Sequence, residues 1–154
     1  MEAHNFMEEV KKLILSLGDS LKRAEAIGVF GSLARRRDFN EHSDIDIFVV
    51  VKDKKVDTDI FWYRTISRIL SPLGRDVTVI VYSVKSLKEI SHWYILRIAS
   101  EGILLFDQGG VKELFLKIIQ AAHKAGLVQE KIGKHMVWTI PHINVGDVVE
   151  VKVE

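Results

Sequence analysis

The sequence has 154 residues, of which 47% are apolar, which is enough for one well-packed domain and too few for two of ordinary size. Its 22 Lys and Arg residues nearly balance 21 Asp and Glu residues, and a net charge of +1 gives no strong nucleic-acid signal, although it allows a local basic patch. The absence of cysteine excludes disulfides, Cys-ligated zinc, iron–sulfur clusters and cysteine nucleophiles.

The first residues and the apolar runs predict a cytoplasmic globular protein with no membrane segment. The opening stretch MEAHNFMEEVKK is charged where a signal peptide would be apolar. The longest apolar runs are far shorter than the ~20 residues that a membrane-spanning helix needs.

Helical and extended segments alternate along the chain. Helical spacing of apolar residues, capping residues and glycine stops predict helices over residues 5–17, 32–37, 57–70, 86–101 and 112–125. Short apolar runs rich in β-branched residues predict strands over residues 26–30, 45–51, 76–82 and 103–106. This alternation predicts an α/β (α+β) domain whose sheet is covered by helices, and the near-uniform apolarity of residues 45–51 and 77–81 indicates two strands buried on both faces.

The C-terminal part has a different pattern. Residues 1–126 are expected to form the main domain, and residues 127–154 a β-hairpin extension of it. Met136, Trp138 and Ile140 alternate with their neighbours, and three valines at positions 149, 151 and 153 alternate with charged residues. We expect these two segments to pair as a packing hairpin, with addition to the main sheet edge or pairing with another subunit as the alternatives.

The residues that suggest chemistry lie between positions 27 and 51. Asp44 and Asp46 are two positions apart at the start of a predicted strand, so their carboxylates project from one face. Neighbouring carboxylates repel each other and resist burial, and a divalent cation would neutralise them. Gly31 and Ser32 lie between a strand and a helix, where backbone amides and the Ser32 hydroxyl can hold a phosphate. Phosphoryl or nucleotidyl transfer needs such a phosphate-binding turn beside a metal-binding pair.

A third carboxylate would complete a site for two metal ions. Asp76 is the preferred candidate, because it opens the next predicted strand and can lie beside the pair in the sheet. Asp53, Asp57 and Asp59 are poorer candidates, since they fall in a polar, lysine-rich segment typical of a solvated loop.

The segment Gly31-Ser32, followed after eleven residues by Asp44-Ile45-Asp46, resembles the signature of the DNA polymerase β-type nucleotidyltransferase superfamily. The local sequence is most similar to the minimal nucleotidyltransferases of prokaryotes. The resemblance covers roughly residues 20–106 and implies a mixed β-sheet flanked by helices. It also implies that Asp44, Asp46 and Asp76 bind two Mg²⁺ ions, that Asp76 helps to deprotonate the attacking hydroxyl, and that Gly31 and Ser32 hold ATP.

The arginines after this turn depart from the family pattern. Family members commonly have a glycine soon after the arginine, whereas here Arg35 is followed by Arg36, Arg37 and Asp38. Arg35 is a candidate ligand of the triphosphate. The alternative interpretation, which we favour for Arg36 and Arg37, is a solvated helix end whose cations suit the helix C-terminus.

The remaining histidines and aromatic residues give weaker signals. His135 and His142 flank the strand of Trp138, but a metal site needs more converging ligands than this pair. We expect the aromatic residues on predicted helices to be core or interface residues rather than a base-stacking platform: Trp62, Tyr63, Trp93 and Tyr94.

The resemblance also suggests a substrate and a partner. Minimal nucleotidyltransferases often act as antitoxins that transfer AMP from ATP to a small helical HEPN-type ribonuclease toxin. Aminoglycoside nucleotidyltransferases use a similar core, so a small-molecule acceptor is an alternative. A catalytically idle module that binds a nucleotide or a partner is a third possibility, and a homo-oligomer is compatible with each of them.

Overall fold

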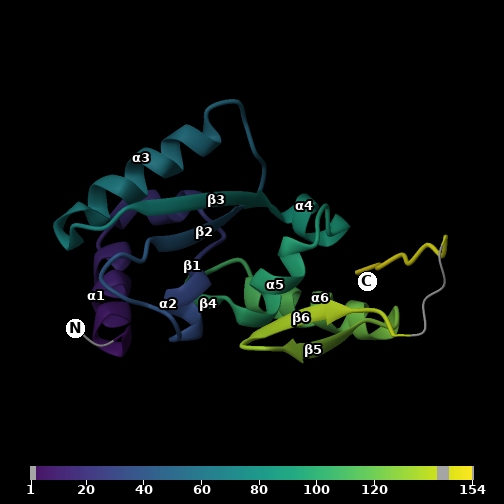
Figure 1. Ribbon diagram of the computed structural model, residues 1–154. Helices are drawn as coiled ribbons and strands as arrows, with labels where there is room; N and C mark the ends of the chain where they lie inside the picture. The colour runs from purple at the N-terminus through teal and green to yellow at the C-terminus, as the bar shows by residue number, and fades with distance from the viewer. Residues whose placement is uncertain (1–2, 142–145, 154) are drawn as a thin grey trace.

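The computed structural model describes residues 3–141 and 146–153 and contains a four-stranded sheet with helices on both faces (Figure 1). The strands lie in the order β3-β2-β1-β4, and their bounds are β1 Ala26–Phe30, β2 Ile45–Val51, β3 Val77–Ser83 and β4 Ile103–Asp107. Strands β2 and β3 are parallel, whereas β1 runs antiparallel to both β2 and β4. The expected mixed sheet is therefore confirmed.

The helices form a layer on each face of this sheet (Figure 1). One layer contains α1 (Ala3–Leu15) and α3 (Thr58–Leu70). The other layer contains α4 (Val84–Glu89), α5 (Tyr94–Glu101) and α6 (Val111–Lys124). A short helix, α2 (Gly31–Arg35), follows β1 directly. No described helix has the length and apolarity needed to cross a bilayer.

Strand β2 joins the two hydrophobic cores of the protein. Ile45, Ile47 and Val49 pack with α1 and α3, whereas Phe48 and Val50 pack with α4, α5 and α6. All five side chains are fully buried. The near-uniform apolarity of β2 follows from burial on both faces, as predicted. The same prediction for residues 77–81 is wrong, because β3 is an edge strand and most of its residues are only partly buried.

The predicted helix over residues 86–101 is wrong, because the structure divides this segment into α4 and α5. The Ser83 hydroxyl caps α4 by accepting a hydrogen bond of 3.1 Å from the Ser86 backbone N–H. Ile90 has a left-handed backbone (φ 46°), which ends α4, and α5 then begins at Tyr94.

The predicted C-terminal β-hairpin is confirmed, but the pairing predicted for its strands is wrong. The hairpin pairs β5 (Val128–Ile132) with β6 (His135–Thr139) in a two-stranded sheet separate from the main one. The two-residue connection includes Gly133 with φ 61°, and such a tight turn fixes the pairing of its flanking strands. Residues 149–153 form no strand, and their valines pack instead against the core beside α4, α5 and α6. Part of the predicted loop, residues 142–145, lies outside the described residues.

Trp138 of β6 anchors the hairpin to the helices. Its indole N–H donates a hydrogen bond of 3.4 Å to the Ser100 hydroxyl on α5, and its ring lies 5.4 Å from the ring of His123 on α6. Every residue of β5 is exposed. The hairpin is therefore held on the domain through β6.

Gly28 gives a test of how closely the centre of the sheet is packed. A Cβ at this position would overlap the Phe48 ring and lie 2.6 Å from the Ile103 carbonyl oxygen. We expect Gly28→Ala to lower the free energy of unfolding in urea by about 3 kcal/mol, because a backbone oxygen cannot move aside as a side chain can. Gly18→Ala is the control, since nothing lies within 4 Å and only its left-handed φ of 63° is strained. That control should lose about 1 kcal/mol, and equal losses would contradict the prediction.

Candidate active site

A cleft of about 540 Å³ lies where β1 ends and β2 begins, on the sheet face covered by α5. It is lined by residues of α2, β2, α5 and β6: Gly31, Ser32, Arg35, Asp46, Tyr94, Arg97, His135 and Val137. Four of the six predicted site residues come together here, from segments on either side of a nine-residue connection, residues 36–44. The sequence signature therefore corresponds to one place in the fold.

The backbone of Gly31 lies directly against the carboxylate of Asp46. The antiparallel pairing of Phe30 with Asp46 brings these neighbours together. A Cβ at Gly31 would overlap Asp46 Oδ2 and lie 3.0 Å from Asp46 Cγ. Gly31 also has a left-handed φ of 71°, so two independent constraints favour glycine at this position.

The environment of Asp46 disfavours the negatively charged form of its carboxyl group. Burial and the nearby charge of Asp44 raise the pKa of Asp46, and a hydrogen bond from the Thr78 hydroxyl and the charge of Arg35 partly oppose this rise in pKa. An added cation would favour the ionised carboxylate, because it would offset both the lost hydration and the repulsion from Asp44.

Asp44 and Asp76 precede the adjacent strands β2 and β3, and neither lines the cleft. Both are exposed, and each comes immediately before its strand. The Ile45 backbone N–H donates a hydrogen bond of 2.9 Å to the Asp76 carbonyl, which places Asp76 beside the start of β2. In the parallel register, however, Thr78 and not Asp76 stands opposite Asp46. Within residues 3–141 and 146–153, no group of three His, Asp or Glu side chains is arranged to hold a metal ion.

Glu101 forms ion pairs with both arginines of the cleft, Arg35 and Arg97. Its Oε2 lies 3.2 Å from Arg97 Nε and 3.8 Å from an Arg35 terminal nitrogen, and its side chain is only 16% exposed. The two guanidinium groups thus share one carboxylate oxygen at the margin of the cleft. Arg36 and Arg37 are exposed and do not line the cleft.

The connection between Arg35 and Asp44 makes its turns without the glycine that family members commonly have there. Arg36 and Asp38 adopt left-handed backbone conformations, with φ of 56° and 60°. Such conformations are strained for residues other than glycine and persist where the surroundings fix them.

Arg75, just before β3, fixes this connection from the side. One terminal nitrogen of its guanidinium donates hydrogen bonds of 2.8 Å to the Asn40 carbonyl and 2.9 Å to the Ser43 carbonyl. The same guanidinium lies 4.9 Å from the ring centres of both Phe6 and Phe39. Arg75 therefore helps to position the segment that leads into Asp44.

Four residues of the cleft are not among the predicted site residues. Tyr94 was expected in a core or interface, but it lines the cleft and packs edge to face on Phe30 with ring centres 5.8 Å apart. Tyr94 and Arg97 are three residues apart on α5, a spacing that indicates a shared helix face. His135 and Val137 alternate along β6, but no sequence pattern connects the hairpin with the aspartates. His142, the other half of the suggested histidine pair, lies outside the described residues.

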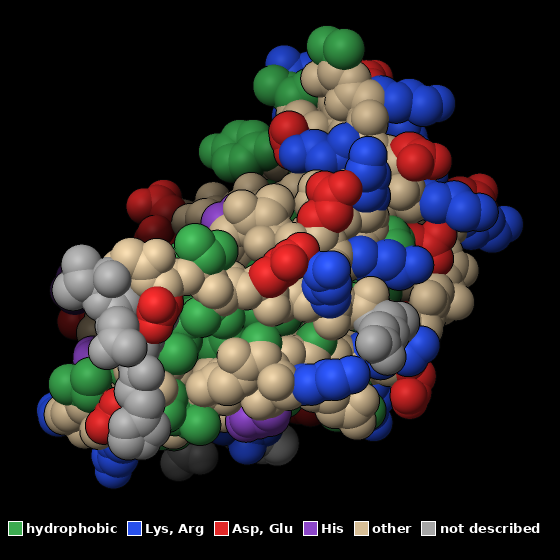
Figure 2. All heavy atoms as spheres, turned by 90° about the vertical axis from the view of Figure 1, so that its right-hand side faces the viewer, with side chains coloured by type: hydrophobic (Ala, Val, Ile, Leu, Met, Phe, Trp, Pro, Cys, Tyr) green, Lys and Arg blue, Asp and Glu red, His purple; other side chains and the backbone are tan. Residues whose placement is uncertain are grey.

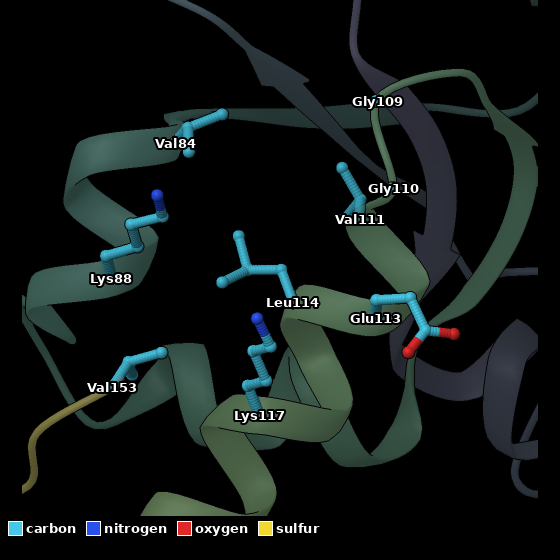
Figure 3. Close-up of a pocket in the computed structure, with 9 residues that line it drawn as sticks. All are labelled: Val84, Lys88, Gly109, Gly110, Val111, Glu113, Leu114, Lys117 and Val153. Atoms are coloured by element: carbon cyan, nitrogen blue, oxygen red, sulfur yellow. The ribbon is translucent and has the colours of Figure 1, made fainter.

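A second cavity, of about 370 Å³, lies at the other end of β2, between α4, α6 and the C-terminal segment (Figures 2 and 3). Figure 3 shows the ammonium groups of Lys88 and Lys117 pointing into it together with Leu114, while the carboxylate of Glu113 points away. The space-filling view shows hydrophobic side chains in a hollow beside lysine and arginine side chains (Figure 2). None of the predicted site residues lines this cavity.

Comparison with protein families agrees with the position of the cleft. The family model described as "Polymerase beta, Nucleotidyltransferase" matches residues 11–109, which include α2, β2 and the three predicted aspartates. The hairpin and α6 lie outside the matched region. No curated protein matches the chain.

Solved structures with a similar fold have low sequence identity to this chain. A putative nucleotidyltransferase from Sulfolobus solfataricus is 23% identical, with 70% of this chain and 86% of that chain covered and a TM-score of 0.47. A complex of tri-AMPylated Shewanella oneidensis HEPN toxin with MNT antitoxin is 22% identical over 71% of this chain and 79% of that chain, with a TM-score of 0.46. A toxin–antitoxin structure with AMP-PNP is 23% identical over 68% and 79%, with a TM-score of 0.48.

The contact between Gly31 and Asp46 can be measured by a double-mutant cycle. Gly31→Ala should lower the free energy of unfolding by the cost of a left-handed alanine plus about 1 kcal/mol for displacing Asp46. In an Asp46→Ala background, the contribution of about 1 kcal/mol from displacing Asp46 should vanish. Gly74→Ala, with φ 66° and nothing within 4 Å, measures the cost of the backbone alone. A cycle with no coupling energy would show that the two residues do not constrain each other.

The raised pKa of Asp46 predicts a pH-dependent stability of the metal-free protein. Because the pKa of Asp46 is above its ordinary value of 3.8 in the folded state, the stability contribution of this group falls as pH rises from about 3.8 through the raised pKa. In EDTA at pH 7, we expect Asp46→Asn to unfold at a higher urea concentration than the wild type, and this difference should shrink as pH falls toward 3.8. The exposed Asp53→Asn is the control and should change stability by no more than about 0.5 kcal/mol.

Proposed function

The chain belongs to the polymerase β nucleotidyltransferase family, and from this membership we propose that it transfers a nucleoside monophosphate, AMP from ATP, to a hydroxyl acceptor. The observation that carries the proposal is the close contact of Gly31 with Asp46 in a cleft that also contains Ser32 and two arginines. This places a carboxylate next to groups that can bind phosphate. Such proximity is what metal-assisted transfer of a phosphorus group requires.

The donor atoms at this site fit Mg²⁺. This ion prefers oxygen ligands and typically takes one or two protein carboxylates, with phosphate oxygens and water completing its coordination. Asp44 and Asp46 would hold it, and we propose Asp76 as a ligand of a second ion. When bound, Mg²⁺ lowers the pKa of the attacking hydroxyl and neutralises charge on the phosphates.

The other residues of the cleft are suited to holding the triphosphate. Ser32 offers a hydroxyl and a backbone N–H, and Arg35 and Arg97 offer guanidinium groups that match phosphate oxygens. We propose that the acceptor oxygen forms a bond to the α-phosphorus while the bond from that phosphorus to the bridging oxygen breaks. Pyrophosphate then leaves, and Asp76 takes the proton from the acceptor. The fixed positive charges of Arg35 and Arg97 would stabilise the negative charge that develops on the phosphates in the transition state.

We propose a small helical HEPN-type toxin as the acceptor. The support is the similarity of the segment from Gly31 to Asp46 to minimal nucleotidyltransferases, which often act as antitoxins toward such proteins. A small-molecule acceptor, as in the aminoglycoside nucleotidyltransferases, is the competing outcome of the labelling experiment below.

A second candidate function is nucleotide binding without transfer. The observation that favours it is the position of Thr78, a hydroxyl residue, opposite Asp46 in the register of β3. Asp76 is displaced from that position, toward the start of the strand. A protein of this kind would bind ATP and Mg²⁺ but would leave no label on any acceptor.

The assignment of the aspartates is tested by removing one charge at a time. Asp44→Asn and Asp46→Asn should each lower the rate of transfer from α-labelled ATP in Mg²⁺ by at least about 100-fold, because each removes a metal-binding carboxylate. Both variants should retain the wild-type circular dichroism spectrum. Asp53→Asn, on an exposed loop, should keep full activity. Full activity of either site variant would refute the assignment.

The acceptor is identified by incubating the protein with α-labelled ATP, Mg²⁺ and either a cell lysate or a purified HEPN-type protein. Label on that protein supports the proposed acceptor, and label on a small molecule supports the alternative. Binding of ATP with no transfer in either mixture would favour the nucleotide-binding module.

A further inference from the structure

We propose that strand β6 of the C-terminal hairpin forms the wall of the cleft that binds the nucleoside. Val137 of β6 and Tyr94 of α5 would contact the base or ribose, and His135 of β6 would form a hydrogen bond with the base or ribose. This inference rests on the nucleotide binding proposed above and assigns a subsite to it. It gives the hairpin a role in substrate binding in addition to packing.

The first support is the way in which β6 is presented to the cleft. His135 and Val137 alternate with Met136 and Trp138, so opposite faces of the strand carry the two pairs. Trp138 packs against the core formed with α5 and α6 and is hydrogen-bonded to Ser100. Val137 and His135 line the cleft together with Asp46 and Ser32. One face of β6 thus holds the hairpin in place, and the other closes the site.

The second support is that cationic side chains and apolar or aromatic side chains come from different lining residues of the cleft. Its cations, Arg35 and Arg97, come from α2 and α5, and both reach the same oxygen of Glu101. These groups and Ser32 suit the triphosphate. An isopropyl group, a phenol ring and an imidazole remain on the other lining residues, and such groups suit an aromatic base and a ribose. The volume of about 540 Å³ lies within the range of sites that enclose small ligands.

The third support is the position of the wall in the sequence. Residues 11–109 match the family, whereas β5 and β6 follow α6 and lie outside the match. The hairpin is therefore a feature that this chain adds to the matched unit, at the one cleft where Gly31 meets Asp46.

The test compares ATP with inorganic tripolyphosphate, which has the three phosphates but no nucleoside. Dissociation constants of the full chain for ATP and for inorganic tripolyphosphate are measured by calorimetry in Mg²⁺. In the double variant His135→Ala and Val137→Ala, we expect the dissociation constant for ATP to rise about tenfold, and that for tripolyphosphate to stay within about twofold of the wild type. The matched control is Gln129→Ala with Lys131→Ala, two exposed residues of β5 that do not line the cleft. The control should bind both ligands like the wild type.

Each other outcome counts against either this inference or the proposed function. Unchanged affinity for ATP in the double variant would overturn the inference and leave β6 as a contact for the acceptor or for packing. Equal weakening of both ligands would overturn it as well, because it would place the hairpin at the phosphates or show a disturbed fold. If the wild type bound neither ligand, the proposed function itself would fail. Thermal unfolding of both variants shows whether the hairpin remains attached.

Discussion

The contact between the Gly31 backbone and the Asp46 carboxylate is the constraint on which the site depends. It exists because β1 and β2 pair antiparallel, with Phe30 opposite Asp46, so that the end of one strand meets the start of the other. The left-handed conformation of Gly31 turns the chain into α2 at this point, which brings Ser32 and Arg35 to the same cleft. Two segments separated by a nine-residue connection thus become one site through a single strand pairing.

The fold separates the tasks of stability and chemistry along β2. From Ile45 to Val51 the strand is embedded between two hydrophobic cores, and only Asp46 interrupts its full burial. A charged group at the end of such a strand is partly desolvated yet still reachable from the cleft, which accounts for the raised pKa of Asp46. The rigid core behind it limits how far this carboxylate can move, and fixed geometry of this kind is what electrostatic catalysis needs.

The main sheet could be predicted from sequence because its signals are local. Strand β2 is marked by its β-branched run, and Gly31 and Asp46 by their spacing. A C-terminal hairpin is predicted correctly, but its paired strands are not, because Val149, Val151 and Val153 have the alternation of a strand and pack instead on a helical layer. His135 reaches the site through the anchoring of Trp138 on α5 and α6, a tertiary contact with no local pattern. The division between α4 and α5 depends on the left-handed backbone of Ile90, which is not a usual position for a β-branched residue.

The contact of Glu101 with both arginines affects how strongly the cleft would attract the nucleotide proposed as its ligand. The positive charges of Arg35 and Arg97 are matched by the carboxylates of Asp46 and Glu101, so these four groups have no net formal charge when all are ionised. Long-range steering of polyanions is therefore weak, in keeping with a chain whose total charge is only +1. If the cleft binds a nucleotide as proposed, selectivity for it would depend on short-range contacts with these side chains rather than on a long-range positive potential.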